Sequence, residues 1–426
     1  MIPVNERLLQ FIWQHQYFNS AQLQTTHNQP LCIRYRGDLN TNQGPDFLQA
    51  RIELDGIQLA GSIELHLRSS DWEVHAHSND PHYKNVILHV VWHDDRPGET
   101  RFPVLELQHR VPVSLLEHYR LLMNRPDSIP CSSLQQQVPE LVWQSWKERL
   151  VAERWTLRME HIATLLQQTQ QSWETVCWVV LARYFGLPHN ADAFESVALS
   201  LPVTLLARHK HQIHQLEALL LGQAGLLEQN FEDAYPQMLQ KEYRFLQHKY
   251  RLQPIDIKVQ ALRMRPGSFP AVRLAQLAML VHQSSHLFSR LIESQSLNEI
   301  RNLLQVTAND FWHRHYTLTA ESPFQPKQTG QQFINNLLIN AVLPVLYAYA
   351  VHHQNTVLQE KALDWLMQIP AENNRIIRLW KQAHVHAQHA FDTQALLQLQ
   401  KMYCLQRNCL ACAIGTAILR KTVTAS

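Results

Sequence analysis

The sequence predicts an α+β, multidomain protein in which a mixed α/β domain over residues 1–130 precedes an all-helical region over residues 131–426. The chain has 426 residues, too many for one small core, so two or three domains are expected. Alternating strand patterns occur before residue 113, whereas long amphipathic stretches with few glycines follow Pro130. The charge divides in the same way. Residues 1–130 hold 11 Lys and Arg against 15 Asp and Glu, and the remainder holds 27 against 21.

The first domain is predicted to open with a helix and to continue with strands. The segment NERLLQFIWQ spaces its apolar residues along one helical face, and Asn5 is a suitable N-cap. Strands are expected in LCIRYRG, RIELDGIQLAGSIELHLR, NVILHVVWHDD and FPVLELQHRVP, with a hairpin turn at Asp55-Gly56. NVILHVVWHDD is apolar on both faces, which is typical of a buried strand.

The region after Pro130 is predicted to be helical. Helices are expected in LVWQSWKERLVAERWTLRMEHIATLL, SWETVCWVVLARYFG, EDAYPQMLQKEYRFLQHKYRL, AVRLAQLAMLVHQ, QQFINNLLINAVLPVLYAYAV and QALLQLQKMYCL. The second of these ends at Gly186, with Pro188 just beyond. The segment TLTAESPFQPKQTGQQ predicts a loop and a subdomain boundary near residues 320–330.

The composition predicts a soluble, cytoplasmic protein with no membrane partner. No run of about 18 apolar residues is present, and the start MIPVNERLLQ carries charge where a signal peptide needs an apolar core. Six cysteines are too few for a disulfide scaffold in a chain of this length, and three of them crowd together near its end. This usage indicates a reducing compartment.

Polar side chains occupy one face of the predicted strand that contains GSIELHLR. Because successive side chains of a strand point to opposite faces, Glu64, His66 and Arg68 share one face. Buried charge is costly unless it is paired or binds a metal. Asp46, which follows Pro45 just before the hairpin, is expected to reach the same place. These four polar residues are therefore the candidate catalytic residues.

An Asp before a hairpin and Glu-x-Lys on the next strand form the pattern of the PD-(D/E)XK nuclease superfamily, which this segment resembles. The resemblance implies a restriction-endonuclease-like fold and phosphodiester hydrolysis of DNA or RNA, with Mg²⁺ or Mn²⁺ held by Asp46 and Glu64. Such a cation activates a water and stabilises charge on the phosphate. His66 stands where the superfamily has Lys, and Arg68 is expected to supply the missing positive charge. Some nucleases of this class add a carboxylate where this chain has Glu6.

Two other interpretations of this segment stay open. In the first, Asp46 caps a turn, Glu64 pairs with Arg68 across strands, and His66 is a core histidine with satisfied hydrogen bonds. In the second, the histidines between residues 66 and 93 hold a transition metal, as in an unrelated hydrolase. Further residues are expected to line the site: His75, His77, Tyr83 and His89.

Six segments occur in a specific order along nearly the whole chain: GPDF, GSIELH, SSDW, DPHYKNVILHVVW, RMRPGSFPAVRLAQLA and CLQRNCLACAIG. This order resembles a bacterial family catalogued as domain of unknown function 2851, which is common in Bacteroidetes. The resemblance implies no particular activity. Members of the family often have Glu-x-His-x-Lys where this chain has Glu64, His66 and Arg68. This favours the interpretation that the positively charged side chain of the motif has moved to position 68 and has not been lost.

The last cysteines follow the spacing Cys-x4-Cys-x2-Cys at Cys404, Cys409 and Cys412. A fourth thiol would complete a tetrahedral site for zinc or an iron–sulfur cluster. Cys131, where the α/β part ends, is the expected fourth ligand. The alternative is that these cysteines are reduced and packed as small apolar residues.

Basic and aromatic residues alternate between residues 241 and 273, where eight Lys and Arg stand against two acidic residues. Phosphates attract such a surface, and exposed aromatic rings stack on bases. The residues expected to bind nucleic acid are Arg244, Lys249, Arg251, Arg263 and Arg265. The alternative is an amphipathic helix with a solvated basic face. For the whole protein, the alternative to a nuclease is a non-catalytic scaffold that keeps the nuclease-like fold and binds a protein partner.

Overall fold

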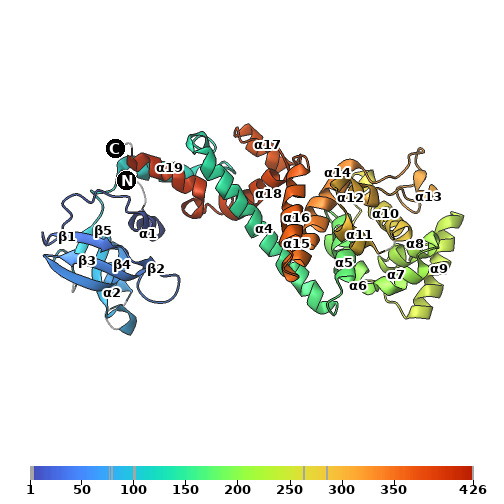
Figure 1. The fold of residues 1–426 in the computed structure, drawn as a ribbon, viewed down its shortest axis with the longest axis horizontal. Helices are drawn as coiled ribbons and strands as arrows, with labels where there is room; N and C mark the ends of the chain where they lie inside the picture. Colours follow the sequence, from blue (N-terminus) through green and yellow to red (C-terminus); the bar gives the residue numbers. More distant parts are fainter. Residues whose placement is uncertain are drawn as a thin grey trace. The chain divides into compact units, whose positions relative to one another are not determined.

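The protein is described by a computed structural model that covers residues 4–75, 77, 80–98, 102–261, 264–284 and 286–424. It contains two compact units, each discontinuous in sequence. Unit 1 comprises residues 1–150, 373–386 and 395–426, and unit 2 comprises residues 151–372 and 387–394. A mixed sheet with helices forms the N-terminal part and mostly helices follow (Figure 1), as the sequence predicts. The predicted domain boundary at residue 130 and the sub-boundary near residues 320–330 stay predictions.

The sheet of unit 1 is curled and mixed. Its strands are β1 (Leu31–Tyr35), β2 (Asp38–Leu39), β3 (Phe47–Leu54), β4 (Ile57–Arg68), β5 (Val86–His93) and β6 (Val104–Glu106). Their order across the sheet is β1-β3-β4-β5-β6, and β2 pairs with β3. β3 is antiparallel to β1 and β4, whereas β5 is parallel to β4 and β6. The pairing therefore changes from antiparallel to parallel at β4.

The hairpin between β3 and β4 fixes the register of the polar residues. Asp55 and Gly56 both have positive φ values, 48° and 79°, as an Asp-Gly hairpin turn requires. The hairpin pairs Phe47 with Ile63, so the residues on either side of this pair are neighbours. Position 46 therefore lies beside position 64.

Helix α1 (Glu6–His15) packs against β4 and begins at the predicted cap. The Asn5 side chain accepts a hydrogen bond from the backbone N–H of Leu8. Four apolar side chains of the helix are fully buried: Leu8, Leu9, Ile12 and Trp13. Burying one such side chain stabilises the fold by roughly 1.5–3 kcal/mol, so this face holds the helix on the sheet.

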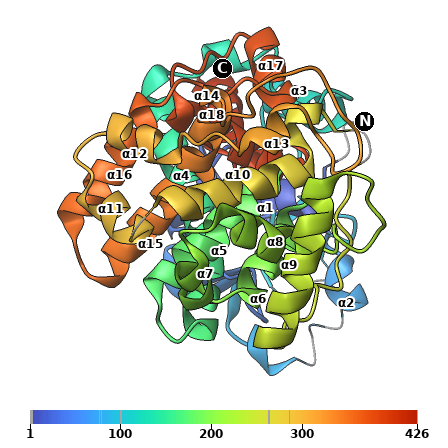
Figure 2. The same ribbon diagram turned by 90° about the vertical axis from the view of Figure 1, so that its right-hand side faces the viewer.

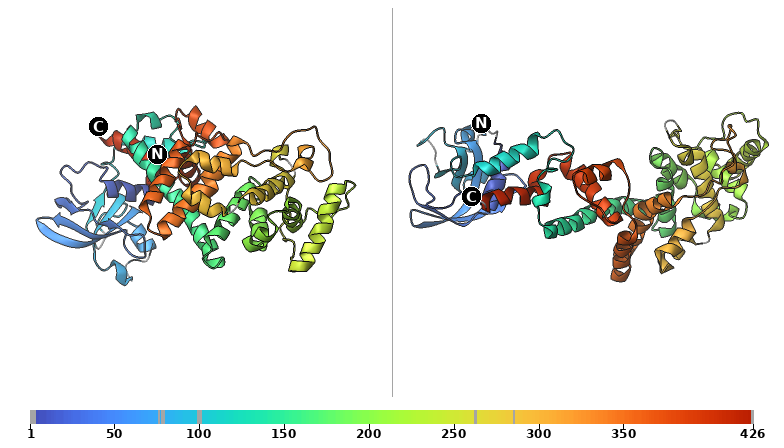
Figure 3. Two further views of the ribbon diagram at one scale, coloured as in Figure 1. Left: turned by 45° about the vertical axis from the view of Figure 1, so that its right-hand side comes forward. Right: turned by 90° about the horizontal axis from the view of Figure 1, so that it is seen from above.

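The other helices of unit 1 come from distant parts of the chain. They are α2 (Asp71–Val74), η2 (Pro81–Tyr83), α3 (Val113–Asn124), η3 (Gln135–Gln137), α17 (Arg375–Gln382), η6 (Gln400–Cys404), η7 (Cys409–Ala411) and α19 (Ala413–Thr424). α4 (Glu140–Gln168) and α18 (Ala390–Leu399) have residues in both units. The red C-terminal helix α19 lies beside the teal α3 (Figure 3). The Gln400 side chain donates to the Ser128 carbonyl at 2.7 Å, so the C-terminal segment also contacts the residues before Pro130.

Unit 2 is helical. Its helices are α5 (Trp173–Phe185), α6 (Ala191–Ser200), α7 (Val203–His209), α8 (Ile213–Gln223), α9 (Ala234–Tyr250), η4 (Pro266–Ser268), α10 (Pro270–Gln283), α11 (Leu287–Glu293), α12 (Leu297–Leu304), α13 (Asp310–His313), α14 (Gln331–Leu337), η5 (Leu338–Val342), α15 (Leu343–His352) and α16 (Thr356–Gln368). α8 packs against both α9 and α10 (Figure 2). Residues 314–330 form a loop between α13 and α14, as predicted.

One helix in the described part of the chain is long and apolar enough to cross a membrane by length and composition. It runs over Gln331–His352 and joins α14, η5 and α15. In its most apolar window 67% of the residues are buried inside the protein. A helix that is mostly buried in this way belongs to the core of the fold.

Candidate functional site

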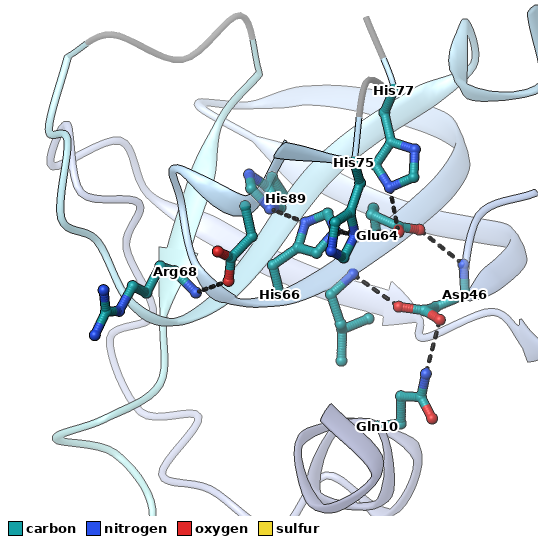
Figure 4. Close-up of polar contacts among 10 residues, drawn as sticks. Gln10, Asp46, Glu64, His66, Arg68, His75, His77 and His89 are labelled. Atoms are coloured by element: carbon teal, nitrogen blue, oxygen red, sulfur yellow. Dashed lines mark hydrogen bonds and ion pairs between the residues drawn. The ribbon is translucent and has the colours of Figure 1, made fainter. Parts of the chain in front are cut away.

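Asp46 and Glu64 meet where β3 begins beside the middle of β4 (Figure 4). The backbone N–H of Asp46 donates to Glu64 Oε2 at 3.0 Å. In return, the backbone N–H of Leu65 donates to Asp46 Oδ2 at 3.0 Å. Gln10 on α1 donates from Nε2 to the other oxygen of Asp46 at 2.8 Å. The hairpin and the first helix therefore fix the two carboxylates side by side.

These two carboxylates are electrostatically unfavourable neighbours. Burial raises the pKa of Glu64 to about 8, and the charge of Asp46 adds to this effect. Burial also raises the pKa of Asp46 to about 6, although hydrogen bonds from Leu65 and Gln10 oppose the increase. The charge of Glu6 raises the pKa of both groups. The site therefore concentrates negative charge that a proton or a cation would neutralise.

His66 lies on the same strand and is almost fully buried. Its Nδ1 lies 2.9 Å from His89 Nε2, and its Nε2 lies 3.2 Å from His75 Nδ1. Burial lowers the pKa of His66 to about 3 and the pKa of His89 to about 4. Both rings are therefore neutral at pH 7, the form in which imidazole accepts protons and binds metals.

His77 connects the histidines to the carboxylates. Its Nε2 lies 3.5 Å from Glu64 Oε1, and His66 Nε2 lies 3.6 Å from the same oxygen. His77 Nε2 is buried and has no hydrogen-bond partner. Ligand atoms of His66, His75 and His77 all lie within 4.8 Å of one another. A cation beside Glu64 would give this orphaned nitrogen a partner.

Aromatic rings enclose the histidines. Tyr83 stacks on His77, with 3.9 Å between the ring centroids. The Trp72 ring makes edge contacts with three rings of the cluster: His66, His77 and His89. Burial, followed by the charge of Glu64, raises the pKa of Tyr83 to about 12. The four residues expected to line the site therefore lie together around His66.

Arg68 is the predicted catalytic residue that the structure does not bring to the carboxylates. β4 ends at Arg68, where the strand has left the buried part of the sheet and the side chain is exposed. Its guanidinium points away from Asp46 and Glu64 (Figure 4). Its backbone N–H donates to Asp71 at 2.9 Å. The position that Lys holds in the superfamily motif is therefore filled by a neutral histidine.

A groove beside α1 was not predicted from the sequence. It has a volume of about 880 Å³ and is lined by Arg7, Arg149, Arg407 and Arg420, and we call it the arginine groove. None of the described residues that line it is acidic. The groove also affects His15, because burial and then the positive charges of Arg36 and Arg420 lower the pKa of this histidine. Because its arginines are scattered from residue 7 to residue 420, no local pattern indicates it.

The basic segment predicted to bind nucleic acid lies in unit 2, on and after α9. Four of the five residues predicted to bind nucleic acid are exposed: Arg244, Lys249, Arg251 and Arg265. Arg263 lies outside the described residues. Tyr243 is buried and Phe245 is 59% exposed, with the Lys249 ammonium 5.8 Å from its ring. This face is amphipathic, and its binding to nucleic acid stays a prediction.

Four of the six cysteines are gathered at one place in unit 1. Cys131, Cys404, Cys409 and Cys412 line one small cavity. Cys32 is exposed and Cys177 is buried elsewhere in the chain. The cysteine chosen from the sequence as the fourth member therefore does lie with the other three.

The fold and the site define a mixed-sheet protein with a buried carboxylate–histidine cluster. The chain belongs to the family described as protein of unknown function (DUF2851), whose model matches residues 6–375. The predicted family is therefore confirmed, and the match includes every residue of the cluster. No curated protein and no solved structure matches the chain.

Proposed function

We propose that this protein is a cation-dependent phosphodiesterase that cleaves nucleic acid in the cytoplasm, with a restriction-endonuclease-like N-terminal domain. The observation that supports it best is the pairing of Asp46 with Glu64. The buried Glu64 and the half-buried Asp46 are held together by reciprocal backbone hydrogen bonds, although desolvation makes both costly to ionise. Such an arrangement is expected where a cation supplies the missing positive charge.

The residues present fit a divalent cation. Asp46 and Glu64 would hold it, and the unpartnered nitrogen of His77 would complete the set on the side of Glu64. When bound, the cation supplies an activated water and stabilises charge on the phosphate. Oxygen ligands alone suit Mg²⁺, whereas a set that includes imidazole favours a transition metal such as Mn²⁺. We therefore expect Mn²⁺ to bind more tightly than Mg²⁺.

His66 is suited to orient the attacking water by accepting a hydrogen bond from it. When its Nδ1 donates to His89, its Nε2 keeps a lone pair directed toward Glu64 and His75. Because burial lowers its pKa to about 3, the ring is neutral at pH 7 and accepts a hydrogen bond, but it is too weak a base to keep the proton of the water. This role differs from that of a lysine, which carries a fixed positive charge.

The arginine groove is suited to bind the phosphate backbone of the substrate. Its arginines attract phosphates without selecting a base sequence. Gln10 lines the groove and donates to Asp46, so the groove and the carboxylate pair share a residue of α1. The exposed cations of α9 are a second candidate surface for DNA or RNA.

Cleavage of labelled single- and double-stranded DNA and RNA with Mn²⁺ or Mg²⁺ tests the proposal. Wild type should cleave at least one substrate, and Glu64→Gln and Asp46→Asn should lose at least about a hundredfold in rate. Glu53→Gln is the matched control, because Glu53 lies on β3 and pairs with the exposed Arg34. Cleavage that persists equally in all four proteins would come from a contaminant and would refute the proposal.

A second function is favoured by the close grouping of His66, His75 and His77. These residues could hold a transition metal by themselves, as in an unrelated hydrolase. In that case Asp46→Asn would leave metal affinity unchanged, whereas our proposal expects it to fall. If purified protein binds no metal and cleaves nothing, the non-catalytic scaffold becomes the better explanation.

A further inference from the structure

Four cysteines that are far apart in sequence converge in unit 1. Cys131 follows the α/β part of the chain, whereas Cys404, Cys409 and Cys412 lie in the turn between α18 and α19. All four line a cavity of about 10 Å³, and each is only 6–8% exposed. A cavity of this size holds about one water-sized sphere. It is therefore enclosed and bordered by sulfur.

Another buried cysteine does not belong to this group. Cys177 lies in α5 of unit 2 and does not line the cavity. Burial of a thiol in this protein therefore does not by itself produce a cluster.

Hydrogen-bond donors are directed at the sulfurs. The backbone N–H groups of Ile414 and Gly415 point to the Cys412 sulfur. The Arg407 guanidinium lies near Cys404 and Cys409. Packed apolar thiols do not need such donors, whereas thiolates bound to a metal do.

One nitrogen of the Arg407 guanidinium lacks an acceptor. Its Nη2 donates to the Arg125 carbonyl, but its Nη1 is buried and has no hydrogen-bond partner. A buried guanidinium N–H without a partner is costly. A negatively charged group in the cluster would satisfy it.

Gly415 fixes the turn that carries the cysteines. A Cβ atom at this position would lie 2.2 Å from the Cys409 carbonyl oxygen, so only glycine lets α19 approach the turn this closely. This contact brings the start of α19 against η7 and sets Cys409 and Cys412 beside each other.

We infer that Cys131, Cys404, Cys409 and Cys412 form a four-thiolate metal centre. Thiolates select zinc or an iron–sulfur cluster. A single zinc ion bound at 2.3 Å would hold its sulfurs about 3.8 Å apart. Among the described residues, ligand groups of three within 4.8 Å occur at the histidines and not at these sulfurs. The spacing is wider than one zinc ion sets, and the cavity is smaller than an iron–sulfur cluster, so we expect either metal to draw the thiolates into its own geometry. The inference does not depend on the proposed nuclease activity.

The test is the metal content of full-length protein purified without oxygen. Zinc near one equivalent per chain, or iron and acid-labile sulfide near one cluster per chain with visible absorption, is expected, and the result identifies the metal of the centre. A folded protein with neither metal would overturn the inference.

Variants locate the metal. Cys131→Ser and Cys412→Ser should lose most of it, whereas Cys177→Ser should keep it, because Cys177 is equally buried but lies in unit 2. If the first two variants do not fold, native mass spectrometry of wild type still decides the question. Metal retained by folded Cys131→Ser and Cys412→Ser variants would contradict the assignment.

Discussion

Replacing Glu64 with Gln should change how stability depends on pH. The pKa of Glu64 is raised from 4.5 to about 8 in the folded protein, so the folded state holds a proton that the unfolded state releases. The free energy of unfolding should therefore fall as pH rises from about 4.5 to 8. Each pKa unit corresponds to about 1.4 kcal/mol, so Glu64 should account for a loss on the order of 4 kcal/mol. Gln cannot ionise and should remove this loss.

Denaturant unfolding at pH 5 and pH 8 measures the effect in wild type, Glu64→Gln and the control Glu53→Gln. Glu217 in unit 2 also has a raised pKa, about 7, and contributes equally to all three proteins. The quantity to compare between the proteins is therefore the change in unfolding free energy from pH 5 to pH 8. Wild type and Glu53→Gln should lose stability at pH 8, and Mn²⁺ should restore it in both but not in Glu64→Gln. Identical pH dependence in the three proteins would refute our account of the buried pair.

Three further predictions concern other parts of the protein. Gly415→Ala should lower thermal stability and the metal content of the cysteine centre, because its Cβ would contact the Cys409 carbonyl; unchanged metal would argue against this role of glycine. Arg420→Glu in the arginine groove should weaken nucleic-acid binding measured by fluorescence anisotropy. The slope of the logarithm of the binding constant against the logarithm of salt concentration should become shallower by about one. An unchanged slope would show that the nucleic acid binds elsewhere. Glu217→Gln should lose less unfolding free energy than wild type between pH 5 and pH 8, measured by denaturant unfolding, because the buried carboxylate no longer ionises. An equal loss in wild type and in Glu217→Gln would contradict this.

The carboxylate pair could be predicted from the sequence because it depends on local rules. Strand alternation and an Asp-Gly turn set the hairpin register, and that register places Asp46 next to Glu64. The helix at the N-terminus was predictable for the same reason, since Asn5 and the apolar spacing lie within one segment. His75 and His77 were weaker predictions, because a loop carries them to His66 and no periodic pattern fixes where a loop goes.

Features that depend on tertiary packing were not accessible in this way. Arg68 shares a strand face with Glu64, but alternation says nothing about where a strand leaves the core, and Arg68 lies beyond that point. The arginine groove is built mainly from α1, α3, α4, the turn before α19 and α19 itself, and no sequence pattern connects these segments. The position of Cys131 beside the other three cysteines was predicted from ligand chemistry instead, because a tetrahedral four-thiolate site would need a fourth thiol.

The neutral state of His66 changes the charge balance expected of this motif. A lysine in its place would bring a positive charge next to Asp46 and Glu64, and would lower the pKa of both. With a neutral ring there, the carboxylates keep raised pKa values, so an incoming cation must displace protons near neutral pH. Cation binding in this protein is therefore expected to be more pH-dependent than in a nuclease with lysine, and to rely on His77 as an additional ligand. In our proposal the histidines would supply through coordination part of what a lysine supplies through charge.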